Sequence, residues 1–187
     1  MRPLYLIWIL SILPLLPTEA QEIDFGSYDD YSLNVEPLGG YETLDFGQVI
    51  SGEGLREIDL GDDPGMGILR IDGVRYLDVY ISITKPDALY ADDPGNDDEI
   101  PITKLEAAYS NNGENDYTSA KFFTNPEARF PILERQHAAP GPPPAPPREG
   151  VTPPEETAYI YIWGSIDVGN VSAGSYSSQI NVTIEYN

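Results

Sequence analysis

Apolar and polar residues alternate with a period of two along two well-marked stretches, residues 76–84 and 179–186. The apolar positions that share one face are Leu77, Val79, Ile81 and Ile83 in the first stretch and Ile180, Val182, Ile184 and Tyr186 in the second. Because successive side chains of a strand point to opposite faces, this pattern predicts antiparallel strands with one buried and one solvated face.

Further strands are predicted in shorter alternating or apolar runs. These runs are Ser32–Pro37, Thr43–Val49, Gly54–Leu60, Ile68–Asp72, Lys121–Phe123 and Ala158–Val168. The stretch Thr103–Ser110 is ambiguous, since its Lys, Leu, Glu and Ala residues are helix formers and allow one short helix. No segment shows a sustained helical period.

Glycine and proline signals separate these runs and indicate chain reversals. They are Gly39-Gly40, Gly52-Glu53-Gly54, Asp63-Pro64-Gly65, Asp72-Gly73, Asp93-Pro94-Gly95-Asn96, Asn112-Gly113 and Ala173-Gly174. Many short strands with such turns are typical of an all-β, antiparallel sandwich or barrel. A parallel α/β sheet is excluded, because the spacing leaves no room for crossover helices.

The segment 138–156 is rich in proline and differs from the rest of the chain. Proline removes a backbone donor and favours extended polyproline conformation, so this segment cannot be a central strand. It is either a linker or a loop inserted in one domain. Only two clear strands follow it, and an isolated hairpin is marginal in water. We therefore expect a Pro-rich inserted loop within a single domain of residues 21–187.

The first 20 residues have the pattern of a secretory signal peptide. Arg2 is followed by an apolar run from Leu4 to Leu16, and Thr18-Glu19-Ala20 then offers small residues at a cleavage site before Gln21. The run is shorter than a membrane span and contains Pro14. Later residues include no long apolar stretch, so the mature chain is expected to have no transmembrane segment. Export without any cysteine suits a bacterial periplasm or cell surface.

The chain has a formal net charge of −21. Such a surface repels phosphate backbones and anionic lipids, so nucleic acid is not an expected partner. The charge also favours solubility.

The two ends of the domain resemble a known pattern. Leu44-Asp45-Phe46-Gly47-Gln48-Val49 is similar to the LDFG-type opening strand of an uncharacterised family of exported bacterial β-sandwich domains. Ala173-Gly174-Ser175-Tyr176 and the terminal run from Ile180 to Asn187 are similar to the closing turn and strand of that family. The same ends are distantly similar to spore-coat-U-like subunits of archaic chaperone–usher pili.

This resemblance implies an immunoglobulin-like sandwich, export and surface fibres, and it implies no catalytic residue. It runs from Leu44 to the C-terminus, but only the ends are distinctive. The Pro-rich insertion is not part of the pattern, and the cysteines that the pilus subunits often carry are absent.

Catalytic motifs are not found. The single histidine, His137, lies beside the Pro-rich segment, and there is no nucleophile elbow, phosphate-binding loop or cysteine. A pair of carboxylates could serve a glycosidase, but 31 acidic residues make such pairs inevitable. We therefore expect a protein that is not an enzyme.

The densest group of oxygen ligands lies in one turn. Its members are Asp92, Asp93, Asn96, Asp97, Asp98 and Glu99. Calcium takes six to eight hard oxygen ligands, and an acidic turn can bring several together. The spacing does not fit an EF-hand. The alternatives are a calcium site and a solvated hairpin tip.

The run from Ala158 to Asp167 is apolar on both faces. Tyr159, Tyr161 and Trp163 share one face, and isoleucines share the other. One interpretation is an exposed aromatic stripe that contacts sugars or another subunit. The favoured alternative is a central strand whose aromatic face is covered by the Pro-rich loop or another segment.

The segment Gln21–Pro37 precedes the first family-like strand. Tyr31, Leu33 and Val35 alternate with polar residues, and Ile23 and Phe25 form an earlier apolar pair. Such an edge strand can pair with its own sheet, which we favour, or add to the sheet of a neighbouring subunit.

Taken together, the sequence favours an exported structural or surface-assembly subunit, fimbria-like or envelope-associated. The alternative is a monomeric adhesive module that binds glycan or calcium.

Overall fold

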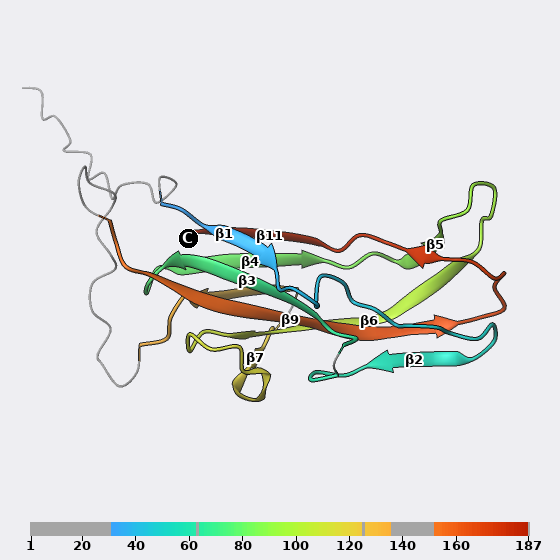
Figure 1. The fold of residues 1–187 in the computed structure, drawn as a ribbon, viewed down its shortest axis with the longest axis horizontal. Coiled ribbons are helices and arrows are strands. Elements are labelled where there is room, and N and C mark those ends of the chain that lie inside the picture. The colour runs from blue at the N-terminus through green and yellow to red at the C-terminus, as the bar shows by residue number, and fades with distance from the viewer. Residues whose placement is uncertain (1–30, 63, 125, 136–151, 187) are drawn as a thin grey trace, which may run out of the picture.

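The computed structural model describes residues 31–62, 64–124, 126–135 and 152–186. Within these residues the chain forms strands and one short 3₁₀ helix, and no α-helix, as Figure 1 shows. The elements are β1 (Asn34–Pro37), β2 (Gly54–Ile58), β3 (Gly67–Val74), β4 (Asp78–Thr84), β5 (Ala88–Ala91), β6 (Glu99–Ser110), η1 (Tyr117–Ser119), β7 (Lys121–Phe122), β8 (Glu127–Pro131), β9 (Glu155–Val168), β10 (Tyr176–Ser177) and β11 (Asn181–Tyr186). The all-β prediction is confirmed.

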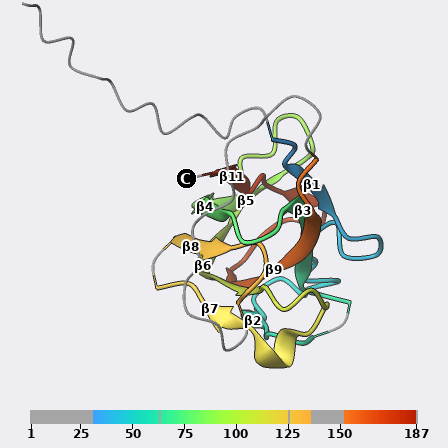
Figure 2. The same cartoon turned by 90° about the vertical axis from the view of Figure 1, so that its left-hand side faces the viewer.

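The strands form two antiparallel sheets. The larger sheet has the order β1-β3-β9-β6-β5-β10, with β2 paired to β9 and β7 paired to β6. The smaller sheet has the order β11-β4-β8. Seen end-on in Figure 2, β4 and β8 lie to one side of β3 and β9. An immunoglobulin-like strand order stays a prediction.

Strand β9 is the centre of the fold because its side chains enter both hydrophobic cores. Ile160 and Ile162 pack between the two sheets against residues of β4 and β8. Tyr161 and Trp163 pack on the opposite face of the larger sheet, together with Phe46. The burial of each such side chain contributes about 1.5–3 kcal/mol. A strand buried on both faces explains the nearly continuous apolar run in the sequence.

The predicted strand Thr43–Val49 is wrong. This segment is an irregular loop, although its Phe46 is buried in the core. Gly47 has a φ of +68°, and its N–H donates to Asp45 Oδ1 at 2.8 Å. An aspartate that bonds the backbone two residues on favours a turn, so the LDFG motif bends around Phe46 instead of extending.

The short helix allowed for Thr103–Ser110 is also wrong, because these residues belong to the long strand β6. Ile102 and the residues from Lys104 to Ser110 pair with β9, and a register shift occurs between Ile102 and Lys104. Pairing with a buried central strand outweighs the helix propensity of the segment.

The turn predicted at Asp72-Gly73 lies instead at Arg75 and Tyr76. Leu77 N–H donates to Val74 O at 3.1 Å, which closes the turn between β3 and β4. Tyr76 has a φ of +65°, a conformation that usually requires glycine. Gly73 lies inside β3, where an added Cβ would be 2.7 Å from the Tyr186 hydroxyl. The glycine therefore serves close packing and not a turn.

Residues 138–151 of the Pro-rich segment and the predicted signal peptide, residues 1–20, lie outside the described residues. β9 begins at Glu155, so the end of the predicted loop belongs to a strand. Phe130, which precedes the Pro-rich segment, and Ile160, which follows it, share one core. In the described part of the chain, no helix is long and apolar enough to cross a membrane.

Candidate functional site

The acidic turn predicted as a calcium site lies between β5 and β6. Asn96 and Asp98 are half-buried, whereas Asp92, Asp93, Asp97 and Glu99 are exposed. Among the described residues, no three Asp, Glu or His side chains gather as a metal ion would require. The six side chains are therefore neighbours in sequence that do not form an assembled ligand set.

Two of these carboxylates bind the segment that follows β9. Asp98 Oδ2 accepts a hydrogen bond from Ser172 N at 2.7 Å, and Asp92 Oδ1 accepts one from Ser177 Oγ at 2.5 Å. Asn96 Oδ1 accepts from Asp98 N at 3.0 Å, which shapes the turn itself. The hydrogen bonds from Ser172 lower the pKa of Asp98. The acidic turn thus joins the β5–β6 connection to residues 172–177.

The aromatic stripe is not an exposed contact surface. Tyr161 is 0% exposed and Trp163 is 3% exposed, and Tyr159 is half-buried. The Tyr161 hydroxyl donates to Asn115 Oδ1 at 2.9 Å, and burial raises its pKa. The hypothesis of a sugar or subunit platform on these rings is therefore wrong, and the alternative of a covered central strand agrees with the structure.

The cover over these rings comes from the connection between β6 and β7. Tyr117 of η1 packs edge-on against Tyr161, with ring centroids 6.5 Å apart. Phe122 of β7 packs edge-on against Trp163, with ring centroids 5.6 Å apart. The indole of Trp163 also donates from Nε1 to Glu106 Oε2 at 3.1 Å. An aromatic pair and a charge-assisted hydrogen bond together fix the indole in the core.

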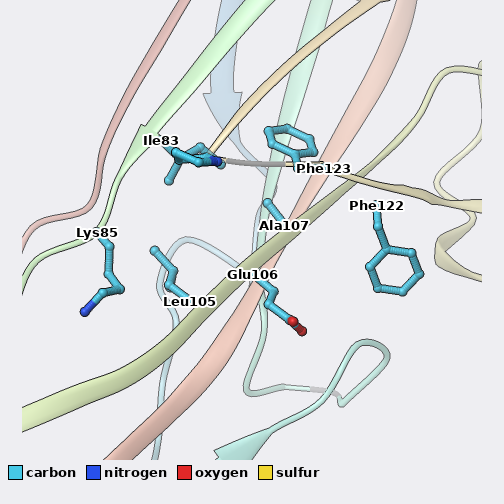
Figure 3. A pocket seen from close by; sticks show the side chains of 8 residues that line it. Ile83, Lys85, Leu105, Glu106, Ala107, Phe122 and Phe123 are labelled. Atoms are coloured by element: carbon cyan, nitrogen blue, oxygen red, sulfur yellow. The ribbon is translucent and has the colours of Figure 1, made fainter.

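A different feature, a cleft of about 390 Å³, opens between the two sheets beside β6. Its walls come from the end of β4, the middle of β6 and the chain around β7. The lining residues are Ile83, Lys85, Leu105, Glu106, Ala107, Phe122, Phe123 and Pro126. Figure 3 shows Leu105 and Ala107 on the β6 backbone, with Lys85 at one end of the group and Phe122 at the other. The cleft is mostly apolar, with two charged groups, as ligand and peptide sites are.

In the part of the chain that the structure describes, the edge of β6 beside this cleft lacks a neighbouring strand. β5 pairs with residues 99–101 of β6, and β7 pairs with residues 108–109. Loop contacts extend these pairings, because Ile102 N donates to Asp87 O at 2.9 Å and Phe123 N donates to Ala107 O at 2.9 Å. Residues 103–106 therefore have β9 on one side and, among the described residues, no paired strand on the other. We call this interval the β6 gap.

Lys85 marks one end of the β6 gap. Its Nζ donates to Ile102 O at 2.9 Å and to Pro86 O at 3.4 Å. By contrast, Lys104 Nζ lies 3.0 Å from Glu106 Oε2, and this hydrogen bond raises the pKa of Lys104. Among the described residues, the Lys85 ammonium group at the strand edge thus has carbonyl partners only.

Comparison with protein-family models, with curated proteins and with solved structures finds no match to this chain. The resemblance to exported β-sandwich domains and to spore-coat-U-like subunits therefore stays a prediction. The sequence did not point to Lys85 or to the β6 gap. The available signal was the alternation of Leu105 and Ala107 with charged residues, which the helix formers obscured.

Proposed function

We propose that this protein is an exported, non-enzymatic structural subunit of a bacterial surface assembly. In this proposal, subunits join when an extended segment adds to the β6 gap. The observation that carries the proposal is the coincidence of an unpaired strand edge, residues 103–106, with an apolar cleft at Leu105 and Ala107. The edge offers backbone hydrogen bonds, and the cleft offers burial for side chains.

Strand addition fits the dimensions of the β6 gap. Four residues of a strand span roughly 13 Å, at about 3.3 Å per residue. A strand edge presents N–H and C=O groups that another chain can satisfy. Peptides bind sheet edges in this way, with affinity from the backbone and specificity from pockets for alternate side chains. The cleft supplies such a pocket on one face of β6.

The occupant we propose is the N-terminal segment 22–26 of a second copy. It reads Glu-Ile-Asp-Phe-Gly, so that Ile23 and Phe25 fall on one face of an extended chain and acidic residues fall on the other. This segment lies outside the described residues. Asn34–Pro37 pairs with β3 of its own sheet, and we assign the exchange to the residues before it.

The positions of donor and acceptor favour an open assembly. β1, which follows the donor segment, lies at one edge of the larger sheet, and the β6 gap faces the side of the sheet that carries β5. Two different surfaces therefore meet in each contact. A contact of this heterologous kind forms a filament when its rotation does not close a ring.

Buried Tyr161 and Trp163 weaken the alternative of a glycan-binding adhesive module, because their rings are not available as a sugar platform. The high acidic charge supports the subunit proposal only in that it favours solubility of the unassembled chain. No catalytic residue is assigned in this proposal.

The decisive experiment measures the molar mass of the chain from Gln21 to Asn187 over a wide concentration range, by light scattering and analytical ultracentrifugation. We expect open-ended polymers. Deletion of residues 21–30 should abolish them, and the Ala107→Phe variant, which fills the cleft, should weaken them. Leu55→Phe is the matched control, because Leu55 is 64% exposed on β2. A chain that stays monomeric and binds no added N-terminal peptide would refute the proposal.

A further inference from the structure

We infer that Lys85 is the specificity-determining residue of the β6 gap, and that it selects a docking segment that carries a carboxylate. This inference rests on the proposed strand addition and names the class of segment that the gap accepts. It concerns which segment the β6 gap binds, and not whether subunits assemble.

The first observation is the pairing of the other cations. Among the described lysine and arginine residues, those with a carboxylate partner within 4 Å are Arg56, Arg70, Arg75, Lys104, Lys121 and Arg129. Arg135 lies over the ring of Tyr76 at 5.0 Å. Lys85 differs from this group, because its hydrogen bonds go to the carbonyl oxygens of Pro86 and Ile102.

The second observation is the chemical context. The chain has 31 acidic and 10 basic side chains, so a cation finds a carboxylate partner easily. Lys85 is nevertheless held by two carbonyl groups, and an ammonium has three donors. Two of its donors are used and one stays available. A cation with a free donor at a strand edge is suited to bind an anion that arrives with a partner.

The third observation is the location of the ammonium at the strand edge itself. Ile102 O, which accepts from Lys85 Nζ at 2.9 Å, immediately precedes the β6 gap. The same lysine lines the cleft beside Leu105 (Figure 3). A segment that adds along residues 103–106 therefore brings the side chain at one of its ends next to Lys85.

The proposed donor segment has this chemistry. Glu22 and Asp24 precede and follow Ile23, so carboxylates lie along the segment on both sides of the residue that would enter the cleft, on the opposite face of the strand. Lys85 would pair with one of these carboxylates and set the register of the added strand. A one-residue slip would turn the acidic residues toward Leu105 and Ala107 and move Ile23 and Phe25 out of the cleft.

Two peptides test the inference. One carries residues 21–28 with a fluorescent label, and the other carries the same sequence with Glu22→Gln and Asp24→Asn. Their dissociation constants are measured by fluorescence anisotropy on the chain from Gln21 to Asn187, below its self-association range, at two salt concentrations. We expect the acidic peptide to bind about tenfold more tightly, a typical loss for one charge-assisted hydrogen bond, and this preference should shrink at high salt.

Three variants complete the experiment, each checked by thermal unfolding. Lys85→Gln should bind both peptides with equal affinity, and Lys85→Glu should prefer a peptide with lysine at positions 22 and 24. Lys121→Gln is the matched control. It makes the same change in charge, but at a lysine whose Nζ pairs with Glu134 Oε2 at 2.7 Å. It should keep the preference of the native chain.

The outcomes separate the inference from the proposed function. If Lys85→Gln still prefers the acidic peptide, Lys85 does not recognise the carboxylate, and the inference is wrong while strand addition stands. If polymers form but neither peptide binds, the donor segment and the inference are both wrong. If the chain neither polymerises nor binds a peptide, the proposed function itself fails.

Discussion

The hydroxyl of Tyr186 accepts a hydrogen bond from Val74 N at 2.8 Å. It also donates to Ser32 O at 2.8 Å. Tyr186 ends β11 in the smaller sheet, whereas Val74 ends β3 in the larger one. One side chain near the C-terminus thus joins the two sheets and the chain that leads into β1.

The Tyr186→Phe variant should be less stable, because it leaves the Val74 N–H without its partner. We expect a loss of about 1–3 kcal/mol in the free energy of unfolding, the cost of an unsatisfied buried donor. Urea unfolding followed by tryptophan fluorescence measures it. Tyr90→Phe, at a tyrosine that is 50% exposed, is the control and should change stability little. Equal stability of the two variants would show that the hydroxyl contributes nothing.

Alkaline pH should unfold the protein through its buried tyrosines. Burial raises the pKa of both Tyr161 and Tyr186. Their neutral forms are therefore favoured by folding, and this contribution is present below the unfolded pKa of about 10 and is lost as pH rises above it. Absorbance at 295 nm should reveal tyrosines that ionise only together with the loss of near-ultraviolet circular dichroism. Complete tyrosine ionisation in a chain that keeps its native spectrum would contradict this prediction.

The strands that the sequence predicts well have a period-two pattern with one buried face. The stretch 76–84 becomes β4, and Ala158–Val168 becomes most of β9. Each of these strands has a paired strand on both sides, so the tertiary structure supports the same conformation as the local pattern. The six oxygen-bearing residues of the acidic turn do not gather at one point among the described residues, since closeness in sequence does not direct the oxygen atoms of a turn to one point.

Errors occur where tertiary contacts override local chemistry. Gly73 reads as a turn residue, but it lies inside β3, where the Tyr186 hydroxyl from the other sheet leaves no room for a Cβ. The β6 gap was beyond prediction because it depends on where β5 ends and β7 begins along a third strand. The local sequence of residues 103–106 does not indicate which strands lie beside them.

Removal of the Trp163 side chain tests the corrected location of the aromatic stripe. We expect Trp163→Ala to lose about 3–5 kcal/mol, because the indole is 3% exposed and packs against Phe122. Guanidinium unfolding provides the measurement, and Tyr90→Ala supplies an exposed aromatic control. A variant as stable as the native chain would restore the hypothesis of an exposed contact stripe.

Acid should weaken the attachment between the β5–β6 turn and the segment after β9. Hydrogen bonds from Ser172 lower the pKa of Asp98, so its carboxylate contributes stability above the unfolded pKa of about 3.9. That contribution disappears as pH falls through the lower folded pKa. The Asp98→Asn variant should therefore melt at a lower temperature than the native chain at pH 7, and the two melting temperatures should converge below pH 4. Asp97→Asn, at an exposed neighbouring position, is the control for the change in net charge.

If calcium raised the melting temperature of the native chain and not that of either variant, at matched ionic strength, the turn would bind metal after all. A difference between native and Asp98→Asn chains that stayed constant with pH would show that the Ser172 contact does not depend on the charge of Asp98.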